Sequence, residues 1–164
     1  MLEPSLAEKF PMFKAGDILI SVRNLNALMV INPTNKKIVW LMEGVTEAQH
    51  TATFQPNGRI LIFDNKWKGG ERSRIIEVDP ATKKVTWSYG EKPEETFFSR
   101  TIGMVQYLPN DHFLITEGKK SKIFEVTRKG KIVWEFKLPG RASIFSAYRY
   151  TDEQLLFMRS STTE

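Results

Sequence analysis

The sequence predicts an all-β fold, a β-propeller segment of about three four-stranded antiparallel blades with a partial fourth. The first observation is a repeat, because Trp40, Trp87 and Trp134 end similar phrases and are separated by 47 and 47 residues. The second is a series of short apolar runs bounded by turn formers, with no long stretch of helical periodicity. A period of roughly 40 to 50 residues with four strands is typical of propeller blades rather than of a helical solenoid, a sandwich or a barrel.

Each unit is expected to contain the same elements in the same order. The predicted first strands are 17–20, 59–63 and 112–115, the second strands are 28–31, 75–78 and 123–126, and the turns are 32–35, 79–82 and 127–130. The Trp-bearing strand closes each unit, and the phrases 53–58 and 107–111 precede two of them. Residues 150–153 and 155–157 begin a fourth copy that is cut short. We therefore expect a lead segment at 1–14 and a partial propeller domain at 15–164.

An incomplete propeller leaves two apolar sheet faces open. Propellers usually have about four to eight blades, and this sequence accounts for about three and a third. Exposed faces of that kind call for a partner. Either upstream blades complete the ring, or two copies of the chain pair as a homodimer to complete it. The sequence enters and leaves in mid-blade, which favours the upstream blades.

Composition narrows the range of partners. The chain has 164 residues, a formal charge of +5 and no cysteine, so disulfides and thiolate metal sites are absent. Much of the basic charge sits in the turns before the Trp strands, at Lys36–Lys37, Lys83–Lys84 and 128–131, which is typical of a solvated rim. We therefore expect no nucleic-acid partner. No apolar run is long enough for a membrane span, and residues 1–10 lack the basic and apolar regions of a signal peptide, so we expect neither a membrane contact nor a signal peptide in this sequence.

Several phrases along the chain resemble those of one enzyme family. They are Asp17–Arg23, Gln49–Ala52, Ile62–Asn65, Ser73–Arg74, Leu108–Asn110, Ile123–Thr127 and Ile144–Tyr150. In this order they resemble bacterial arylsulfotransferases of the type that needs no nucleotide sulfate donor. The resemblance runs from about Gly16 to Tyr150, and the Ser-x-Arg, Gln-His-Thr-Ala and Phe-Asp-Asn series is its specific part.

The resemblance implies a six-bladed, usually periplasmic propeller that transfers a sulfuryl group from an aryl sulfate to a phenol. His50 in the Gln-His phrase would be the nucleophile, and Arg23 would hold the sulfuryl oxygens. Family enzymes also use histidines of earlier blades, and no histidine precedes Arg23 here. The alternative is therefore a non-catalytic propeller scaffold or binding module.

The chemistry of the two main candidates agrees with these roles. A neutral imidazole can attack sulfur and form a covalent intermediate, and a guanidinium presents a planar set of donors to sulfate oxygens. Each residue could also have no catalytic role. His50 would then be a hydrogen-bonded polar residue at the start of a strand, and Arg23 would be a cation on the surface.

Weaker substrate-binding candidates are Asp64, Asn65, Arg74, Arg100 and Trp67. Asp64 and Asn65 end an apolar strand and could orient His50, or they could serve the turn that follows their strand, which is the commoner use of such residues. No phosphate loop, serine elbow or histidine pair with metal-ligand spacing is present, so no cofactor or metal is expected. A metal held by carboxylates and carbonyls stays open.

Overall fold

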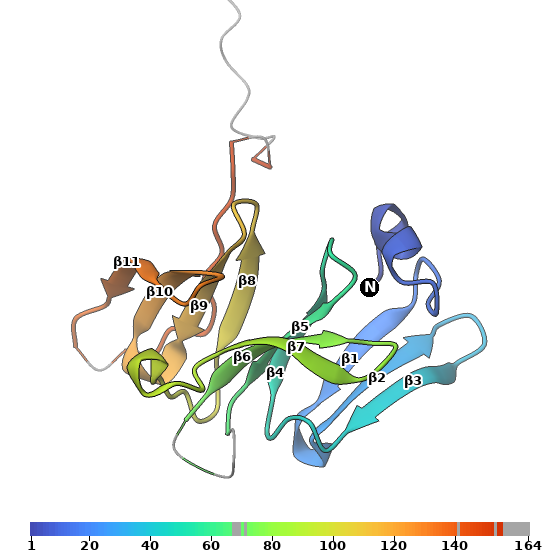
Figure 1. The fold of residues 1–164 in the computed structure, drawn as a ribbon, viewed down its shortest axis with the longest axis horizontal. Helices are drawn as coiled ribbons and strands as arrows, with labels where there is room; N and C mark the ends of the chain where they lie inside the picture. Colours follow the sequence, from blue (N-terminus) through green and yellow to red (C-terminus); the bar gives the residue numbers. More distant parts are fainter. Residues whose placement is uncertain (67–69, 71, 141, 153, 156–164) are drawn as a thin grey trace, which may run out of the picture.

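The chain folds into three antiparallel sheets that stand side by side in chain order in the computed structural model (Figure 1). The structure describes residues 1–66, 70, 72–140, 142–152 and 154–155. The sheets consist of β1 (Ile18–Val22), β2 (Ala27–Asn32) and β3 (Lys37–Glu43); β4 (His50–Phe54), β5 (Ile60–Asp64), β6 (Arg74–Asp79) and β7 (Lys84–Tyr89); and β8 (Met104–Leu108), β9 (His112–Glu117), β10 (Lys122–Thr127) and β11 (Ile132–Lys137). Short 3₁₀ helices lie at η1 (Pro4–Lys9), η2 (Arg23–Leu25), η4 (Pro93–Glu95) and η5 (Gly118–Lys120). Within these described ranges, no helix has the length and apolar character needed to cross a membrane.

Within each sheet, every strand pairs with the next strand along the chain, which is the order predicted for propeller blades. The three sheets even share one irregularity, a register shift just beyond the Trp-bearing pair. The pairs that precede it are Val30 with Trp40, Glu77 with Trp87 and Glu125 with Trp134. The all-β propeller prediction is confirmed, with one difference in the first blade. Its sheet has three strands in the described part of the chain, because no fourth strand pairs with the outer edge of β1.

The turns before the Trp strands follow from their sequence. In the first two sheets the side chains of Asn32 and Asp79 accept hydrogen bonds from backbone N–H groups two and three residues ahead. Lys36 and Lys83 then adopt a φ of 57°, and Gly130 has the same role in the third sheet at a φ of 84°. An Asx side chain closes such a turn locally, and a glycine accepts the left-handed conformation without strain.

The core consists of two apolar layers between neighbouring sheets. Ile60 and Ile62 of β5 face the first sheet, whereas Leu61 and Phe63 face the third. Because β5 is buried on both faces, its sequence shows no polar alternation. The repeat is therefore a stack of sheets, each covered by the next.

The repeated tryptophans form hydrogen bonds from one blade to the next. Nε1 of Trp40 donates to the carbonyl oxygen of Pro80 at 2.8 Å, and Nε1 of Trp87 donates to that of Arg128 at 2.9 Å. Both acceptors lie in the turn before the last strand of the following sheet. Trp40 is only 8% exposed, whereas Trp134, which ends the third sheet, is 43% exposed. Packing between blades is thus the function of the repeated indole, as the sequence indicated.

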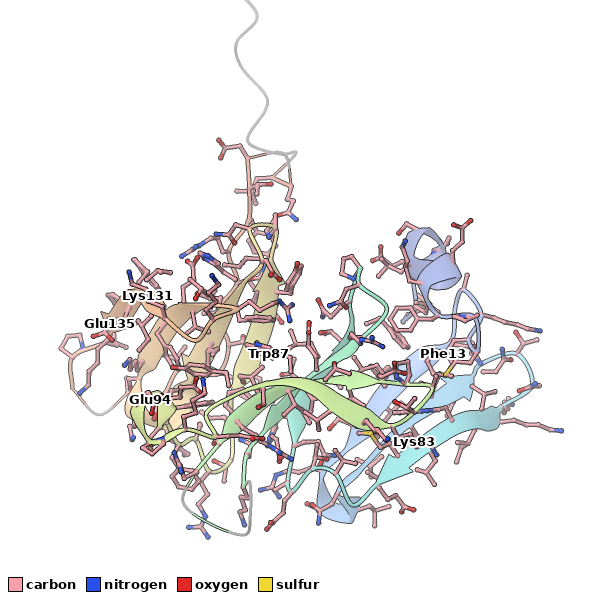
Figure 2. The ribbon with its side chains drawn as sticks, viewed as in Figure 1. Phe13, Lys83, Trp87, Glu94, Lys131 and Glu135 are labelled. Carbon is pink, nitrogen blue, oxygen red and sulfur yellow. The ribbon has the colours of Figure 1, made fainter. Side chains whose placement is uncertain are left out.

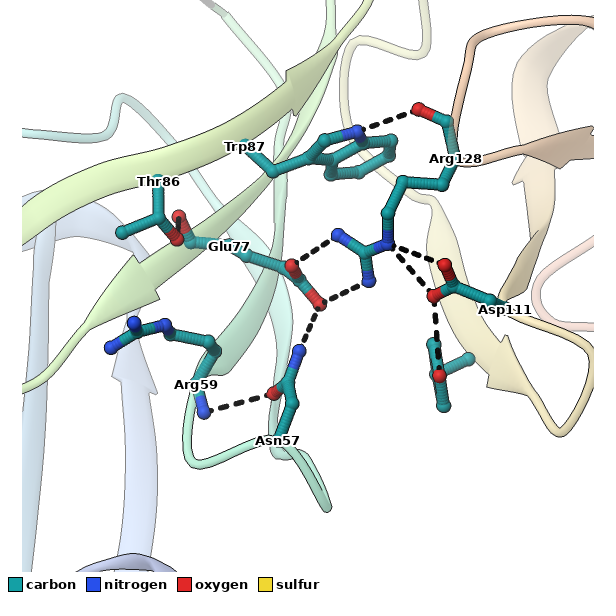
Figure 3. Close-up of polar contacts among 8 residues, drawn as sticks. Asn57, Arg59, Glu77, Thr86, Trp87, Asp111 and Arg128 are labelled. Atoms are coloured by element: carbon teal, nitrogen blue, oxygen red, sulfur yellow. Dashed lines mark hydrogen bonds and ion pairs between the residues drawn. The ribbon is translucent and has the colours of Figure 1, made fainter.

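A charged cluster reinforces the second junction (Figure 3). The Arg128 guanidinium lies 5.3 Å from the Trp87 ring and binds Glu77 of the second sheet, with Nη1 to Oε2 at 2.7 Å. Its Nε also donates to Asp111 at 2.8 Å. These hydrogen bonds, that to Glu77 foremost, raise the pKa of Arg128 above its usual value.

The lead segment contributes to the first apolar layer. Leu2, Phe10 and Phe13, the last labelled in Figure 2, are buried there. The ring of Phe13 meets that of Trp40 edge-on, with the ring centroids 6.1 Å apart. The boundary at residue 14 stays a prediction. At the other end, residues 150–152 and 154–155 form no strand, and residues 153, 156 and 157 of the expected fourth copy lie outside the described residues.

Replacing Trp40 with Phe is expected to lower the free energy of unfolding by about 1–3 kcal/mol, because the buried Pro80 carbonyl loses its donor. The matched control is Trp134→Phe, which removes the same atoms from a half-exposed ring and should change stability by about 0.5 kcal/mol or less. Denaturant unfolding at low protein concentration measures both. Equal losses in the two variants would contradict the fastening role of the indole hydrogen bond.

Candidate functional site

His50 begins β4, the first strand of the second of the three sheets. This strand forms one edge of its sheet, and it packs beside both β1 and β8. The sheet therefore delivers His50 to the place where the innermost strands of neighbouring blades meet.

The backbone around His50 is strained and tied to the first sheet. Ala48 has a φ of 54° and Thr51 a φ of 30°, and the pairing of β4 with β5 is irregular between His50 and Ala52. A β-branched residue at positive φ costs of order 1–3 kcal/mol and persists only where its surroundings enforce it. Here the side-chain hydroxyl of Ser21 donates to the Gln49 carbonyl at 3.2 Å.

Asn65 fixes the orientation and the tautomer of the imidazole. Its Oδ1 lies 2.7 Å from Nδ1 of His50, while its Nδ2 donates to the carbonyl oxygens of Ser99 at 2.7 Å and Ile102 at 3.3 Å. Since a carbonyl can only accept, these two bonds settle which end of the amide faces His50. Nδ1 of the neutral ring therefore carries the proton, and Nε2 holds the lone pair.

A hollow of about 280 Å³ adjoins the imidazole. It is lined by His50, Thr51, Ile102, Gly103, Met104, Phe145, Ser146 and Tyr148. Phe145 and Tyr148 come from the segment after β11 and are largely exposed. Sequence reasoning assigned them no role, although they belong to the Ile144–Tyr150 phrase that carried part of the resemblance.

Asp64 and Arg74 pair with each other rather than with His50. Nε of Arg74 donates to Oδ2 of Asp64 at 2.9 Å, and the Glu47 N–H donates to Oδ1 at 2.8 Å. Burial raises the pKa of Asp64, and these hydrogen bonds offset the rise only in part. The pair borders a separate hollow of about 400 Å³, formed with residues 44–47 and Asn26. The contacts of the Asp64–Arg74 pair hold in place the loop that precedes β4.

The same anchor recurs in the third sheet. Glu117 ends β9 as Asp64 ends β5, and its Oε1 accepts a hydrogen bond from the Phe98 N–H at 2.8 Å. In both blades a buried carboxylate thus holds the loop that leads into its own innermost strand. This repetition favours a structural interpretation of Asp64.

The remaining candidates are not brought together. Arg23 begins η2, and its Nη1 donates to Oδ1 of the adjacent Asn24 at 3.1 Å. Arg100 is exposed in the loop before β8, and Trp67 lies outside the described residues. No cluster of three or more His, Asp or Glu suited to a metal occurs in the part of the chain that the structure describes.

A family model for arylsulfotransferases (ASST) matches residues 5–138 of this chain. The chain belongs to the arylsulfotransferase family. No curated protein matches its sequence. This chain is therefore an arylsulfotransferase-like propeller segment.

Solved structures support the fold alone. A protein of unknown function from Bacteroides caccae aligns with a TM-score of 0.52 and 20% identity, over 76% of this chain and 43% of its own. The WD40 β-propeller domain of Doa1 aligns with a TM-score of 0.56 and 16% identity, over 77% of this chain and 38% of its own. The chain thus spans about two fifths of the length of these propeller-like proteins.

The tautomer assignment has a direct spectroscopic test. ¹⁵N NMR of the neutral imidazoles is expected to find the proton of His50 on Nδ1. Asn65→Leu should abolish that preference, because the accepting amide oxygen is gone. His112, the other histidine of the chain, is the internal control, since its Nδ1 contacts Glu125 at 2.6 Å and does not involve Asn65. A His50 with its proton on Nε2 in the unchanged protein would contradict the assignment.

The Asp64–Arg74 pair predicts a dependence of stability on pH. The folded pKa of Asp64 lies above its unfolded value, so between these values folding takes up a proton and stability falls as the pH rises. Arg74→Met removes the guanidinium that lowers this pKa, so the window widens upward. The loss should reach about 3 kcal/mol at pH 7 and be smaller at pH 4. Urea unfolding at both pH values measures it, with exposed Arg100→Met as control; equal losses of Arg74→Met at both would contradict the account.

Proposed function

We propose that this chain carries the nucleophile of a sulfuryl-transfer site, with His50 attacking the sulfur of an aryl sulfate. The observation that supports this most is the Asn65 hydrogen bond to Nδ1, because it leaves the lone pair on Nε2. A nucleophile with its second nitrogen held by a fixed acceptor is the arrangement expected for histidine covalent catalysis.

In the first step Nε2 of His50 forms a bond to sulfur, and the bond from sulfur to the aryl oxygen breaks. The phenolate leaves and takes a proton from solvent. The sulfurylated ring carries positive charge, and Asn65 stabilises it by accepting from Nδ1–H. In the second step the oxygen of another phenol attacks sulfur, the N–S bond breaks, and the phenol proton passes to solvent. Asn65 acts as a positioning residue throughout.

Arg23 is the proposed clamp for the sulfuryl oxygens. It follows β1 by one residue, at the repeat position that Asn65 occupies after β5. Ser21 at the end of β1 contacts the Gln49 carbonyl, which places this end of the strand next to His50. A guanidinium there would meet developing charge on the sulfuryl oxygens. Arg100 and Trp67 are proposed as outer contacts, whereas the Asp64–Arg74 pair is proposed to support the loop that leads into β4 and His50.

The hollow beside His50 suits an aromatic group. Phe145 and Tyr148 present ring surface, and Ser146 adds a hydroxyl. Aromatic side chains pack against a substrate ring at their edges and faces. We propose that the aryl part of the donor occupies this hollow and that periplasmic localisation follows the family. The ring would be completed by upstream blades or by a second copy.

The deciding experiment incubates the chain with a chromogenic aryl sulfate, with and without a phenol acceptor. Without acceptor, mass spectrometry is expected to find one sulfuryl group on the peptide that contains His50. With acceptor, turnover should fall at least about 1,000-fold in His50→Ala, because the covalent route is lost.

His112→Ala is the matched control and should keep both labelling and turnover. Labelling on another residue, or turnover that His50→Ala leaves unchanged, would refute the assignment of the nucleophile. Asn65→Leu should slow labelling more than it weakens donor binding, which distinguishes a positioning role from a binding role.

A second candidate is a non-catalytic scaffold or binding module. The half-exposed Trp134 and the exposed side chains of Ile132, Val133 and Phe136 on β11 favour it, because they form an apolar surface open to a partner. An unmodified chain that neither becomes sulfurylated nor turns over substrate would support this candidate over the first.

A further inference from the structure

We propose that Thr51 binds the phenol that accepts the sulfuryl group, by accepting a hydrogen bond from the phenol O–H. The inference rests on the proposed sulfuryl transfer at His50 and adds an acceptor site to it. Two observations carry it. A distortion of β4 places Thr51 in the same hollow as His50, and the Thr51 hydroxyl already donates its proton within the chain.

His50 and Thr51 line the same hollow of about 280 Å³, although they are neighbours in one strand. Consecutive side chains of a regular strand point to opposite faces of its sheet. In the pairing with β5, residues 62–63 are opposite Ala52 and His50, so Thr51 between them is the extra residue of a β-bulge. Bulges redirect side chains and are over-represented next to active sites. The bulge in β4 thus explains how two consecutive residues reach one hollow.

The fold of a blade does not require this bulge. β8 occupies the place of β4 in the third sheet, and it pairs with β9 in regular register. The register shifts beyond the Trp-bearing pairs, by contrast, recur in all three sheets. Thr51 also has a φ of 30°, and a β-branched residue at positive φ persists only where its surroundings enforce it. A strained feature that the neighbouring blade lacks is attributed to the site rather than to the blade.

The Thr51 hydroxyl is oriented as an acceptor for a ligand. Its Oγ1 donates to the carbonyl oxygen of Gly103 at 3.3 Å, since a carbonyl can only accept. The chain passes this point at a glycine because a Cβ at Gly103 would lie 2.4 Å from the Phe63 ring. A hydroxyl that donates its own proton can still accept through the lone pairs of its oxygen. The half-buried Thr51 therefore suits a ligand that brings a proton of its own.

Of the two substrates, only the acceptor carries such a proton. The bridging oxygen of an aryl sulfate has none, whereas a phenol has its O–H. Phe145 and Tyr148 line the same hollow and offer their rings to the ring of the phenol. In the second step the phenol oxygen attacks the sulfur on His50, the N–S bond breaks, and the phenol proton passes from its hydrogen bond with Thr51 to solvent. Thr51 itself neither gains nor loses a proton.

Steady-state kinetics separate the two half-reactions. In a ping-pong reaction, kcat/KM for the donor reports the steps up to labelling of His50, and kcat/KM for the acceptor reports the steps after it. Thr51→Val keeps the branched shape and removes the hydroxyl. It should lower kcat/KM for p-cresol about 10-fold, as for the loss of one hydrogen bond, and leave kcat/KM for p-nitrophenyl sulfate unchanged. Thr51→Ser should restore the acceptor value, and Thr53→Val, at an exposed position of β4 outside the hollow, is the matched control.

Equal losses in the two kcat/KM values of Thr51→Val, or no loss in either, would overturn the acceptor site, while labelling of His50 would still support the nucleophile. If the unchanged chain is not labelled, sulfuryl transfer fails, and binding decides whether Thr51 holds a phenol. For that measurement ¹⁹F NMR compares p-fluorophenol with p-fluoroanisole, which lacks the O–H, in a His50→Ala background where no imidazole competes for the proton. A preference for the phenol of about 10-fold that Thr51→Val abolishes supports the site. No preference, or one that Thr51→Val leaves intact, overturns it.

Discussion

The structure depends on one requirement, that each buried indole N–H must find an acceptor on the next blade. Burying an unpaired indole N–H costs about 1–3 kcal/mol, so a tryptophan at this position is stabilised by an acceptor in the turn of the following sheet. The turn carbonyls of Pro80 and Arg128 provide it, and each is exposed by an Asx-closed or glycine-containing turn. The repeat of 47 residues is therefore a repeat of junctions as much as of sheets.

The geometry of the candidate site depends on these contacts between blades. His50 stands on a strand of the second sheet, but Ser21 of the first sheet fixes the Gln49 carbonyl beside it. Asn65 follows the second sheet, and the loop into the third sheet orients its amide through the Ser99 and Ile102 carbonyls. Three blades thus cooperate to present one imidazole nitrogen. A change in either junction would displace the groups that select the tautomer, even where it touches neither His50 nor Asn65.

The fold could be predicted from the sequence because each propeller blade repeats the same order of strands and turns. Doubly buried strands such as Ile60–Asp64 lack alternation, and the Trp phrases mark where each sheet ends. The three-stranded first blade was not predicted, although the phrases 53–58 and 107–111, which overlap β4 and β8, precede only the second and third units. Of the site, His50 and Asn65 were both named, yet their hydrogen bond depends on a loop about 35 residues away from Asn65. The pairing of Asp64 with Arg74 was not predicted, because it depends on the register of β5 and β6, which places the two residues opposite each other.

Hydrogen exchange at the indole nitrogens tests the central claim most directly, since it reports each junction by itself. In a dilute solution of single chains, the account predicts slow exchange for the indole protons of Trp40 and Trp87, which lie in completed junctions, and fast exchange for that of Trp134. Equal and rapid exchange at all three positions would contradict it, because the blades would then not be joined through the indole and the turn.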